Sequence, residues 1–225
     1  MIKNVCDLCT IADKYYKYLK GKIEFLEDGF PIFSKEMFLD SEPDIIVPFH
    51  CRNNKIVKDR KKTVICFYSG DADLYCRLEK IFDDLQEYKK YQGIIGLDIT
   101  VTTDMDLEWQ NMIMLVNQLF LAVAACNGIK IVMNARIGNQ ETVENLKGFP
   151  KRIICATSFL GCDNLQSEYD FGFLSKVLYI LPLKLLIYGK HDRIAEKQLL
   201  TMGIDYRVYS DMHRLTKGGC KNGRQ

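Results

Sequence analysis

Residues 63–101 read TVICFYSGDADLYCRLEKIFDDLQEYKKYQGIIGLDITV, and this stretch contains one complete strand–helix–strand pattern. The runs 63–68 and 94–101 are almost continuously apolar, which is typical of strands covered on both faces of a sheet. Between them, apolar side chains recur every three or four residues across 74–91, the spacing of an amphipathic helix. The stretch therefore predicts parallel strands joined through a helix.

The same alternation continues on both sides of this stretch. Further strands are predicted over 45–49, 129–134, 152–157, 183–188 and 206–209, and further helices over 106–127, 171–181 and 194–202. This pattern indicates an α/β fold with a mostly parallel sheet and flanking helices, either open and doubly wound or an incomplete or distorted (β/α) barrel. Segment 134–152 is short for a full crossover helix, so we expect only a turn or two of helix there.

The length of 225 residues allows one sizeable core, and we expect a single α/β domain over 1–225. Residues 1–42 are broken by glycine and proline and are expected to form an irregular N-terminal extension. Within it we predict a short helix over 11–19, followed by an irregular or hairpin-like segment. Residues 212–225 are expected to form a basic, flexible tail.

The composition indicates a soluble, cytoplasmic protein. The chain starts with polar and charged residues, which does not fit a signal peptide. Its nine cysteines are an odd number without a secretory context, so reduced thiols are expected. The longest apolar stretch, 112–125, is interrupted by Asn117 and Gln118 and is shorter than the roughly 18 to 20 residues of a membrane span, so no membrane partner is expected.

The formal net charge of +2 is too small to indicate a nucleic-acid partner by itself. Basic residues nevertheless gather in two clusters, 55–62 and 214–224. One interpretation is that these clusters contact nucleic-acid phosphates, and the other is a solvated loop and a solvated tail. The clusters consist of Lys55, Lys58, Arg60, Lys61 and Lys62, and of Arg214, Lys217, Lys221 and Arg224.

Polar residues follow the predicted strands, and the carboxyl ends of parallel strands face one crevice, where sites of α/β proteins lie. Asp98 interrupts an apolar strand, and a buried carboxylate needs a partner, a proton or a metal. Arg136 and Asn134, at the end of the next strand, are its expected partners. The group is either a structural ion pair or a catalytic site in which Asp98 is a general base or metal ligand and Arg136 binds a phosphate or carboxylate.

Other strand ends supply further candidates. Tyr188 is a candidate catalytic residue, and His191 is either a proton-transfer residue or a cap or surface residue. The backbone N–H groups of 158–163 suit an anion, although the segment lacks the lysine of a P-loop and the glycines of a dinucleotide fingerprint. Cys162 is a further candidate nucleophile, but no sequence motif links a histidine to it as the base that would activate its thiol. The predicted ligand-binding residues are Thr100, Ser158, Gly161, Cys162, Asp163 and His191.

Two metal sites are conceivable, and neither matches a specific signature. Asp98, Asp104 and Asp106 offer oxygen ligands for Mg²⁺, but Asp104 is equally well explained as the N-terminal cap of the helix 106–127. Cys6 and Cys9 have the spacing of half a zinc site, which His50 and Cys51 would complete, and free thiols are the alternative. We therefore predict no metal, and the sequence identifies no cofactor.

Several short motifs carry a family resemblance. They are GLDIT at 96–100, GIKIV at 128–132 running into Asn134, Ala135 and Arg136, GFPK at 148–151, Ser158 with Gly161 and Cys162, and LIYG at 186–189. Through them, residues 93–211 resemble an uncharacterised family found in phages, mobile elements and bacteria, described as domain of unknown function 4417. The resemblance implies an α/β domain often carried by phages or mobile elements, and it supplies no reaction, substrate or catalytic residue.

Three classes of function remain open, and the sequence does not decide whether the protein is an enzyme. The first is an enzyme or binding protein for a phosphorylated small molecule or nucleotide, with Asp98, Asn134 and Arg136 at the centre of its pocket. The second is a nucleic-acid-associated protein that uses the clusters 55–62 and 214–224. The third is a protein-interaction module without catalysis.

Overall fold

The computed structural model describes residues 4–159 and 171–218. Its centre is a seven-stranded sheet in which every neighbouring pair is parallel and the strands follow one another in chain order. A doubly wound sheet reverses its strand order at a switch point, whereas a (β/α) barrel does not. The expected α/β fold is confirmed as a nearly closed barrel. Its strands are β1 (Ile45–Pro48), β2 (Thr63–Phe67), β3 (Gly93–Leu97), β4 (Ile131–Asn134), β5 (Ile154–Ser158), β6 (Lys184–Gly189) and β7 (Asp205–Ser210).

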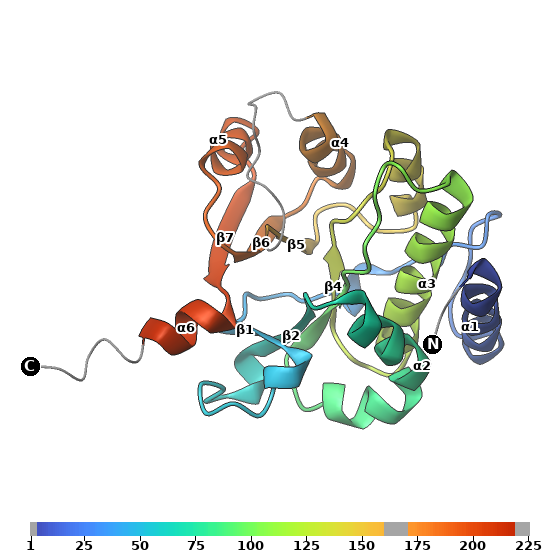
Figure 1. Ribbon diagram of the computed structural model, residues 1–225, viewed down its shortest axis with the longest axis horizontal. Helices are drawn as coiled ribbons and strands as arrows, with labels where there is room; N and C mark the ends of the chain where they lie inside the picture. Colours follow the sequence, from blue (N-terminus) through green and yellow to red (C-terminus); the bar gives the residue numbers. More distant parts are fainter. Residues whose placement is uncertain (1–3, 160–170, 219–225) are drawn as a thin grey trace, which may run out of the picture.

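Helices follow most of the strands and cover the outside of the curled sheet (Figure 1). Helix α1 lies against α3, on the side of α3 away from the sheet. The α-helices are α1 (Val5–Leu19), α2 (Asp71–Tyr88), α3 (Leu107–Cys126), α4 (Phe171–Ile180), α5 (Arg193–Thr201) and α6 (Met212–Gly218). The 3₁₀ helices are η1 (Lys35–Met37), η2 (Phe49–Cys51), η3 (Arg60–Lys62) and η4 (Gln140–Leu146). Helix η4 is the short helical segment expected between β4 and β5.

The apolar core is divided in two by the sheet. Because successive side chains of a strand point to opposite faces, each strand sends one row inward and the other toward the helices. The outer cluster joins the sheet to the helices and includes Ile65, Phe67, Ile94 and Phe120. The inner cluster fills the barrel and takes members from every strand, namely Leu39, Ile46, Val64, Cys66, Tyr68, Ile95, Val132, Ile154, Ala156, Leu186, Tyr188 and Tyr209.

The segment that precedes β1 contacts the last two strands at the amino end of the barrel. The carboxylate of Glu42 accepts a hydrogen bond from Lys184 Nζ of β6 and another, of 3.2 Å, from Arg207 Nη1 of β7. The buried Tyr209 hydroxyl donates to the carbonyl of Pro43 at 2.9 Å. These contacts tie β6 and β7 to the entry of β1, across the gap where the first and last strands are not paired.

Element ends differ from the predictions where contacts distant in sequence decide them. Strand β3 ends at Leu97, because its pairing with β2 shifts register between Ile65 and Phe67, so Asp98 follows the strand and does not interrupt it. Helix α1 starts at Val5, six residues earlier than predicted, because the Asn4 side chain accepts a hydrogen bond from the backbone of Asp7.

Residues 212–218 form helix α6, and the expectation of a flexible tail is wrong for them. Arg214 holds this helix against the barrel, since its Nη1 donates to the carbonyl of Gly189 at 2.7 Å. Its backbone N–H also donates to Asp211 Oδ1 at 2.9 Å, which caps the first turn.

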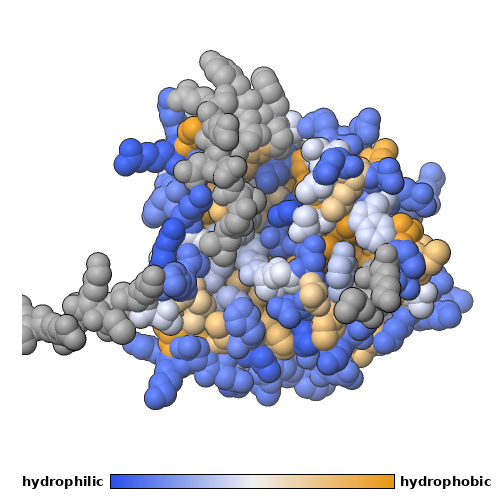
Figure 2. All heavy atoms as spheres, viewed as in Figure 1, coloured by the Kyte–Doolittle hydropathy of each residue, from blue (hydrophilic) through white to orange (hydrophobic). Residues whose placement is uncertain are grey.

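Within the described ranges, α3 alone is long and apolar enough to cross a membrane by length and composition. Of its most apolar window, 61% is buried inside the structure, so here it packs as a core helix. Figure 2 shows hydrophilic side chains over most of the outline of the viewed face, with apolar side chains in smaller patches. The exposed large apolar residues among those described are Ile32, Leu107, Leu178, Leu181, Leu183 and Leu200.

We expect Glu42→Gln to lower the free energy of unfolding by about 1 kcal/mol, because glutamine keeps the size of the side chain but loses two partly exposed ion pairs. In thermal denaturation this corresponds to a melting temperature lower by about 2–4 °C. The hydrogen bond from Lys184 lowers the pKa of Glu42 in the folded protein. Its stabilisation is therefore present at neutral pH and lost as the pH falls through this lowered pKa, so the two proteins should converge in acid.

The matched control for this experiment is Asp44→Asn, since Asp44 is an exposed carboxylate 4.0 Å from Lys62 at the same end of the barrel. This variant is expected to melt within experimental error of the wild type. Equal losses in the two variants would contradict a specific role of Glu42 in closing the barrel.

Candidate functional site

Inward-facing polar side chains gather at the carboxyl end of the barrel. Tyr68 and Tyr188 belong to the inner cluster at the ends of β2 and β6. Asn134 ends β4 two residues beyond the inner-cluster residue Val132, so the alternation of the strand directs it to the same side, and Arg136 follows two residues after the strand ends. Asp98 follows β3 directly and contacts both of them. We call these five residues, Tyr68, Asp98, Asn134, Arg136 and Tyr188, the barrel mouth.

Asp98 has both partners that the sequence predicts. Its Oδ1 accepts a hydrogen bond of 2.9 Å from Asn134 Nδ2 and one of 3.1 Å from Arg136 Nη1. Asn134 Nδ2 also donates to the carbonyl of Leu97 at 3.1 Å, which fixes the amide between the two strands. The side chains of Asp98 and Arg136 are 18% and 28% exposed. In the described part of the chain, Asp98 Oδ2 and the other Arg136 N–H groups have no hydrogen-bond partner, so both remain available to a ligand.

Tyr68 is the unexpected member of the mouth. Its ring stacks on that of Tyr188, with centroids 5.3 Å apart and an interplanar angle of 17°. The Tyr188 hydroxyl accepts a hydrogen bond from the backbone of Met212, whereas the buried Tyr68 hydroxyl has no partner within 4–159 and 171–218. Burial, followed by the charge of Asp98, raises the pKa of Tyr68 well above its usual value. The phenol is therefore protonated at neutral pH and holds an unused O–H donor.

Two thiols lie near these groups. Burial raises the pKa of Cys66 far above its usual value, with smaller contributions from Asp98 and Cys51. Burial also raises the pKa of Cys51. A protonated thiol is a weak nucleophile and a poor metal ligand, so neither cysteine has the environment of an activated thiolate.

The mouth continues into a small cavity between the sheet and α3. Asn134 and Arg136 line this cavity together with Asn117 and Gln118 of α3, and its volume is about 30 Å³, enough for a water-sized group. The side-chain oxygens of Asn117 and Gln118 are buried and accept no hydrogen bond from the described residues. The cavity therefore offers acceptors beside the donors of Arg136.

The predicted ligand-binding residues lie in different surroundings. Ser158 ends β5 and pairs in register with Tyr188, which places it beside the mouth. Thr100 instead binds Asp71 Oδ1 at the start of α2, through its backbone N–H at 3.0 Å and its hydroxyl at 3.1 Å. The side chain of His191 is 74% exposed and lies 2.9 Å from Glu196. The predictions for Gly161, Cys162 and Asp163 fall outside the described residues.

The structure does not bring the candidate metal ligands together. The N-terminal cap position of α3 is occupied by Asp106, whose side chain makes no capping hydrogen bond, so the prediction that Asp104 caps this helix is wrong. Cys6 and Cys9 lie on α1, and His50 and Cys51 lie in η2. Among the residues described, no group of three or more His, Cys, Asp or Glu side chains is arranged to hold a metal ion.

The structure describes the cluster 55–62 and only the start of the cluster 214–224, since Lys221 and Arg224 fall outside the described residues. Helix η3, with Lys61 and Lys62, directly precedes β2 at its amino end, whereas Arg214 binds the last carbonyl of β6 at the carboxyl end. Lys61 Nζ donates to the carbonyl of Lys89 at 2.9 Å, and Lys62 lies 4.0 Å from Asp44. Nucleic-acid binding by the two clusters stays a prediction.

Comparison with known proteins identifies a family over most of the chain. The model of the family described as "Domain of unknown function (DUF4417)" matches residues 29–207. This range includes all five residues of the barrel mouth and extends the predicted resemblance toward the N-terminus, well before Gly93. No curated protein and no solved structure matches the chain.

We expect Tyr68→Phe to leave the free energy of unfolding unchanged or to raise it by up to about 1 kcal/mol, because phenylalanine keeps the ring stack and removes a buried hydroxyl without a partner. The matched control is Tyr209→Phe, which removes a buried hydroxyl that donates to Pro43 at 2.9 Å and is expected to cost about 1 kcal/mol. Urea denaturation measures both. A loss in Tyr68→Phe as large as in the control would show that its hydroxyl has a structural partner.

Proposed function

Because the chain belongs to the family described as "Domain of unknown function (DUF4417)", a description that assigns no activity, we propose from the barrel mouth itself that the protein binds a phosphorylated small molecule or nucleotide there. The observation that carries this proposal is the Tyr68 hydroxyl, which is buried beside the Asp98–Arg136 ion pair and has no hydrogen-bond partner among the described residues. Leaving a buried hydroxyl without a hydrogen bond costs about 1–3 kcal/mol. A ligand that accepts this hydrogen bond would recover that free energy.

The donors at the mouth favour an anionic oxygen ligand. Arg136 donates one N–H to Asp98. The remaining N–H groups of its planar guanidinium can bind two oxygens of one phosphate. Tyr68 adds a neutral O–H donor, and its raised pKa keeps that proton in place near neutral pH. Asp98 holds the guanidinium in position, so little side-chain freedom is lost when a ligand binds. A purely structural ion pair would not require the additional donor.

The same residues support proton transfer on the bound molecule. Asp98 Oδ2 has no hydrogen-bond partner in the described part of the chain, so it can accept the proton of a ligand hydroxyl or of a water. Tyr68 keeps its proton and can donate a hydrogen bond to an oxygen of the same ligand. Asp98 is thus the proposed general base, Tyr68 a neutral hydrogen-bond donor to the ligand, and Arg136 the group that binds the phosphate.

Arg136→Gln tests the binding part of this proposal. Glutamine keeps a hydrogen-bond donor for Asp98, and Asn134 still donates to the same oxygen, so we expect the variant to fold. Native mass spectrometry of the wild-type protein should show a bound phosphorylated molecule that is absent from the variant. The affinity for that molecule should fall at least about tenfold, because charged hydrogen bonds are lost. Arg193→Gln, at the exposed start of α5, is the control and should bind normally.

Two results would contradict the proposal. One is a folded Arg136→Gln variant that keeps the bound molecule and its affinity. The other is a wild-type protein that holds no phosphorylated molecule and binds none, which would leave Asp98 and Arg136 as a structural pair. Binding to nucleic acid that weakens steeply with salt, or capture of a protein partner, would then be the next predictions to test.

A further inference from the structure

A second pocket lies outside the barrel, between the ends of β1 and β2 and the first turns of α2. Its volume is about 220 Å³. Phe49 and Phe67 supply apolar walls, and Arg52, Ser69 and Arg77 supply hydrogen-bond donors. We call this space the α2 pocket.

The α2 pocket and the barrel mouth are on opposite faces of the sheet. Phe67 belongs to the outer core cluster, whereas its neighbours Cys66 and Tyr68 belong to the inner one. Phe49 packs on Phe67 and on Tyr88 of α2, with ring centroids 6.0 and 5.6 Å apart. No residue of the barrel mouth lines the α2 pocket.

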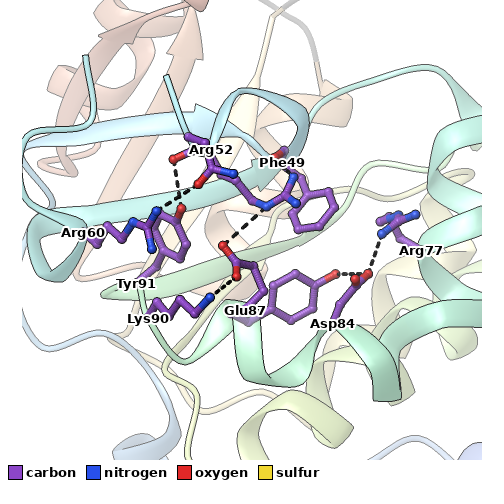
Figure 3. A network of polar contacts seen from close by, with 10 residues as sticks. Phe49, Arg52, Arg60, Arg77, Asp84, Glu87, Lys90 and Tyr91 are labelled. Atoms are coloured by element: carbon purple, nitrogen blue, oxygen red, sulfur yellow. Dashed lines mark hydrogen bonds and ion pairs between the residues drawn. The ribbon is translucent and has the colours of Figure 1, made fainter. Parts of the chain in front are cut away.

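Two guanidinium groups meet at the ring of Phe49. The central carbon of Arg52 lies 4.1 Å from the ring centroid, and that of Arg77 lies 4.9 Å from it. Figure 3 shows Arg52 beside this ring and Arg77 next to Asp84. Two cations beside one aromatic ring concentrate positive charge, which an anion in the pocket would neutralise.

Both arginines keep donors for a ligand. Arg52 Nη1 donates to the carbonyl of Phe49 at 3.0 Å, while its buried Nε lies 3.5 Å from Glu87 and makes no hydrogen bond with the residues that the structure describes. Arg77 donates through Nη1 to Asp84 at 2.6 Å and through Nη2 to Cys76 at 3.3 Å. A guanidinium has five N–H groups, so each fork retains unused donors.

A surrounding network fixes these two side chains before any ligand arrives (Figure 3). Lys90 pairs with Glu87, and the Tyr88 hydroxyl donates to Asp84 at 3.2 Å, so both acids that hold the arginines are themselves anchored. The Tyr91 hydroxyl donates to the carbonyl of Arg52 at 2.9 Å. A donor that is already fixed loses little conformational entropy on binding.

We propose that the α2 pocket is a second anion site, which binds the phosphate of a phosphomonoester between Arg52, Arg77 and Ser69. The groups that face or surround the pocket include the cations Arg52, Arg60, Arg77 and Lys90 and the acids Asp73, Asp84 and Glu87. Asp84 and Glu87 are engaged by the network. Asp73 lines the pocket itself and favours a phosphomonoester that also carries an alcohol hydroxyl, since this hydroxyl can donate to the carboxylate while the phosphate oxygens face the arginines.

The experiment uses isothermal titration calorimetry with inorganic phosphate and with glycerol 3-phosphate. All proteins carry Arg136→Gln, so binding at the barrel mouth cannot be mistaken for binding at the α2 pocket. Adding Arg52→Gln should weaken phosphate binding at least about tenfold, and Ser69→Ala about threefold, because each removes a donor to the anion. Arg60→Gln is the matched control: this arginine belongs to the same network through Asn53 and Tyr91 but does not line the pocket. It should change the affinity less than about twofold.

Asp73→Asn tests the selectivity. Glycerol 3-phosphate should bind the reference protein more tightly than inorganic phosphate, and this advantage should shrink in the variant. The site is refuted if Arg52→Gln leaves the phosphate affinity unchanged. It is also refuted if Arg60→Gln lowers the phosphate affinity as much as Arg52→Gln does, because that result would indicate a diffuse basic surface. Should Arg52→Gln fail to fold, unchanged binding in Ser69→Ala refutes the site in the same way. Neither outcome depends on whether the barrel mouth binds a ligand.

Discussion

The two-residue alternation of strand side chains governs this structure, because the sheet is curled and its two faces meet different surroundings. The inner face has only a narrow space to fill, and it is filled mainly by apolar side chains from every strand. The outer face packs on helices and needs a second apolar row. Strands β1 to β6 are therefore buried at nearly every position, whereas β7, at the edge of the sheet, has mostly exposed and half-buried residues.

The two ends of the barrel use their polar groups differently. At the amino end, the carboxylate of Glu42 binds both Lys184 and Arg207, and the Tyr209 hydroxyl binds Pro43. At the carboxyl end, Asp98 uses one carboxylate oxygen, and the Tyr68 hydroxyl has no partner in the described chain. Satisfied polar groups hold a structure together, and unsatisfied buried ones require another explanation. This contrast supports the candidate site at the carboxyl end, where the Tyr68 hydroxyl lies beside a charged pair; at the amino end, Gln92 Oε1 is also buried without a partner among the described residues.

The sequence predicts the strands, the helices and the Asp98–Arg136 contact because each depends on local pattern and on the shared edge of parallel strands. Tyr68 was missed since it ends an apolar run, where an aromatic residue is usually interpreted as core. That its hydroxyl lacks a partner among the described residues becomes visible only when Tyr188 and Met212 are placed around it. Helix α6 depends on a contact between Arg214 and Gly189, and the end of β3 depends on its register with β2. No local pattern contains such information.

The register of β1 and β2 assigns neighbouring residues to the two proposed sites. Val47 pairs with Ile65 and Pro48 with Cys66, which leaves Phe67 facing α2 and Tyr68 facing the barrel interior. A shift of one residue in β2 would exchange these two aromatic side chains between the faces. It would remove the Tyr68 hydroxyl from the barrel mouth and the apolar wall from the α2 pocket at once. The two sites share no side chain, yet a single strand register holds both of them in place.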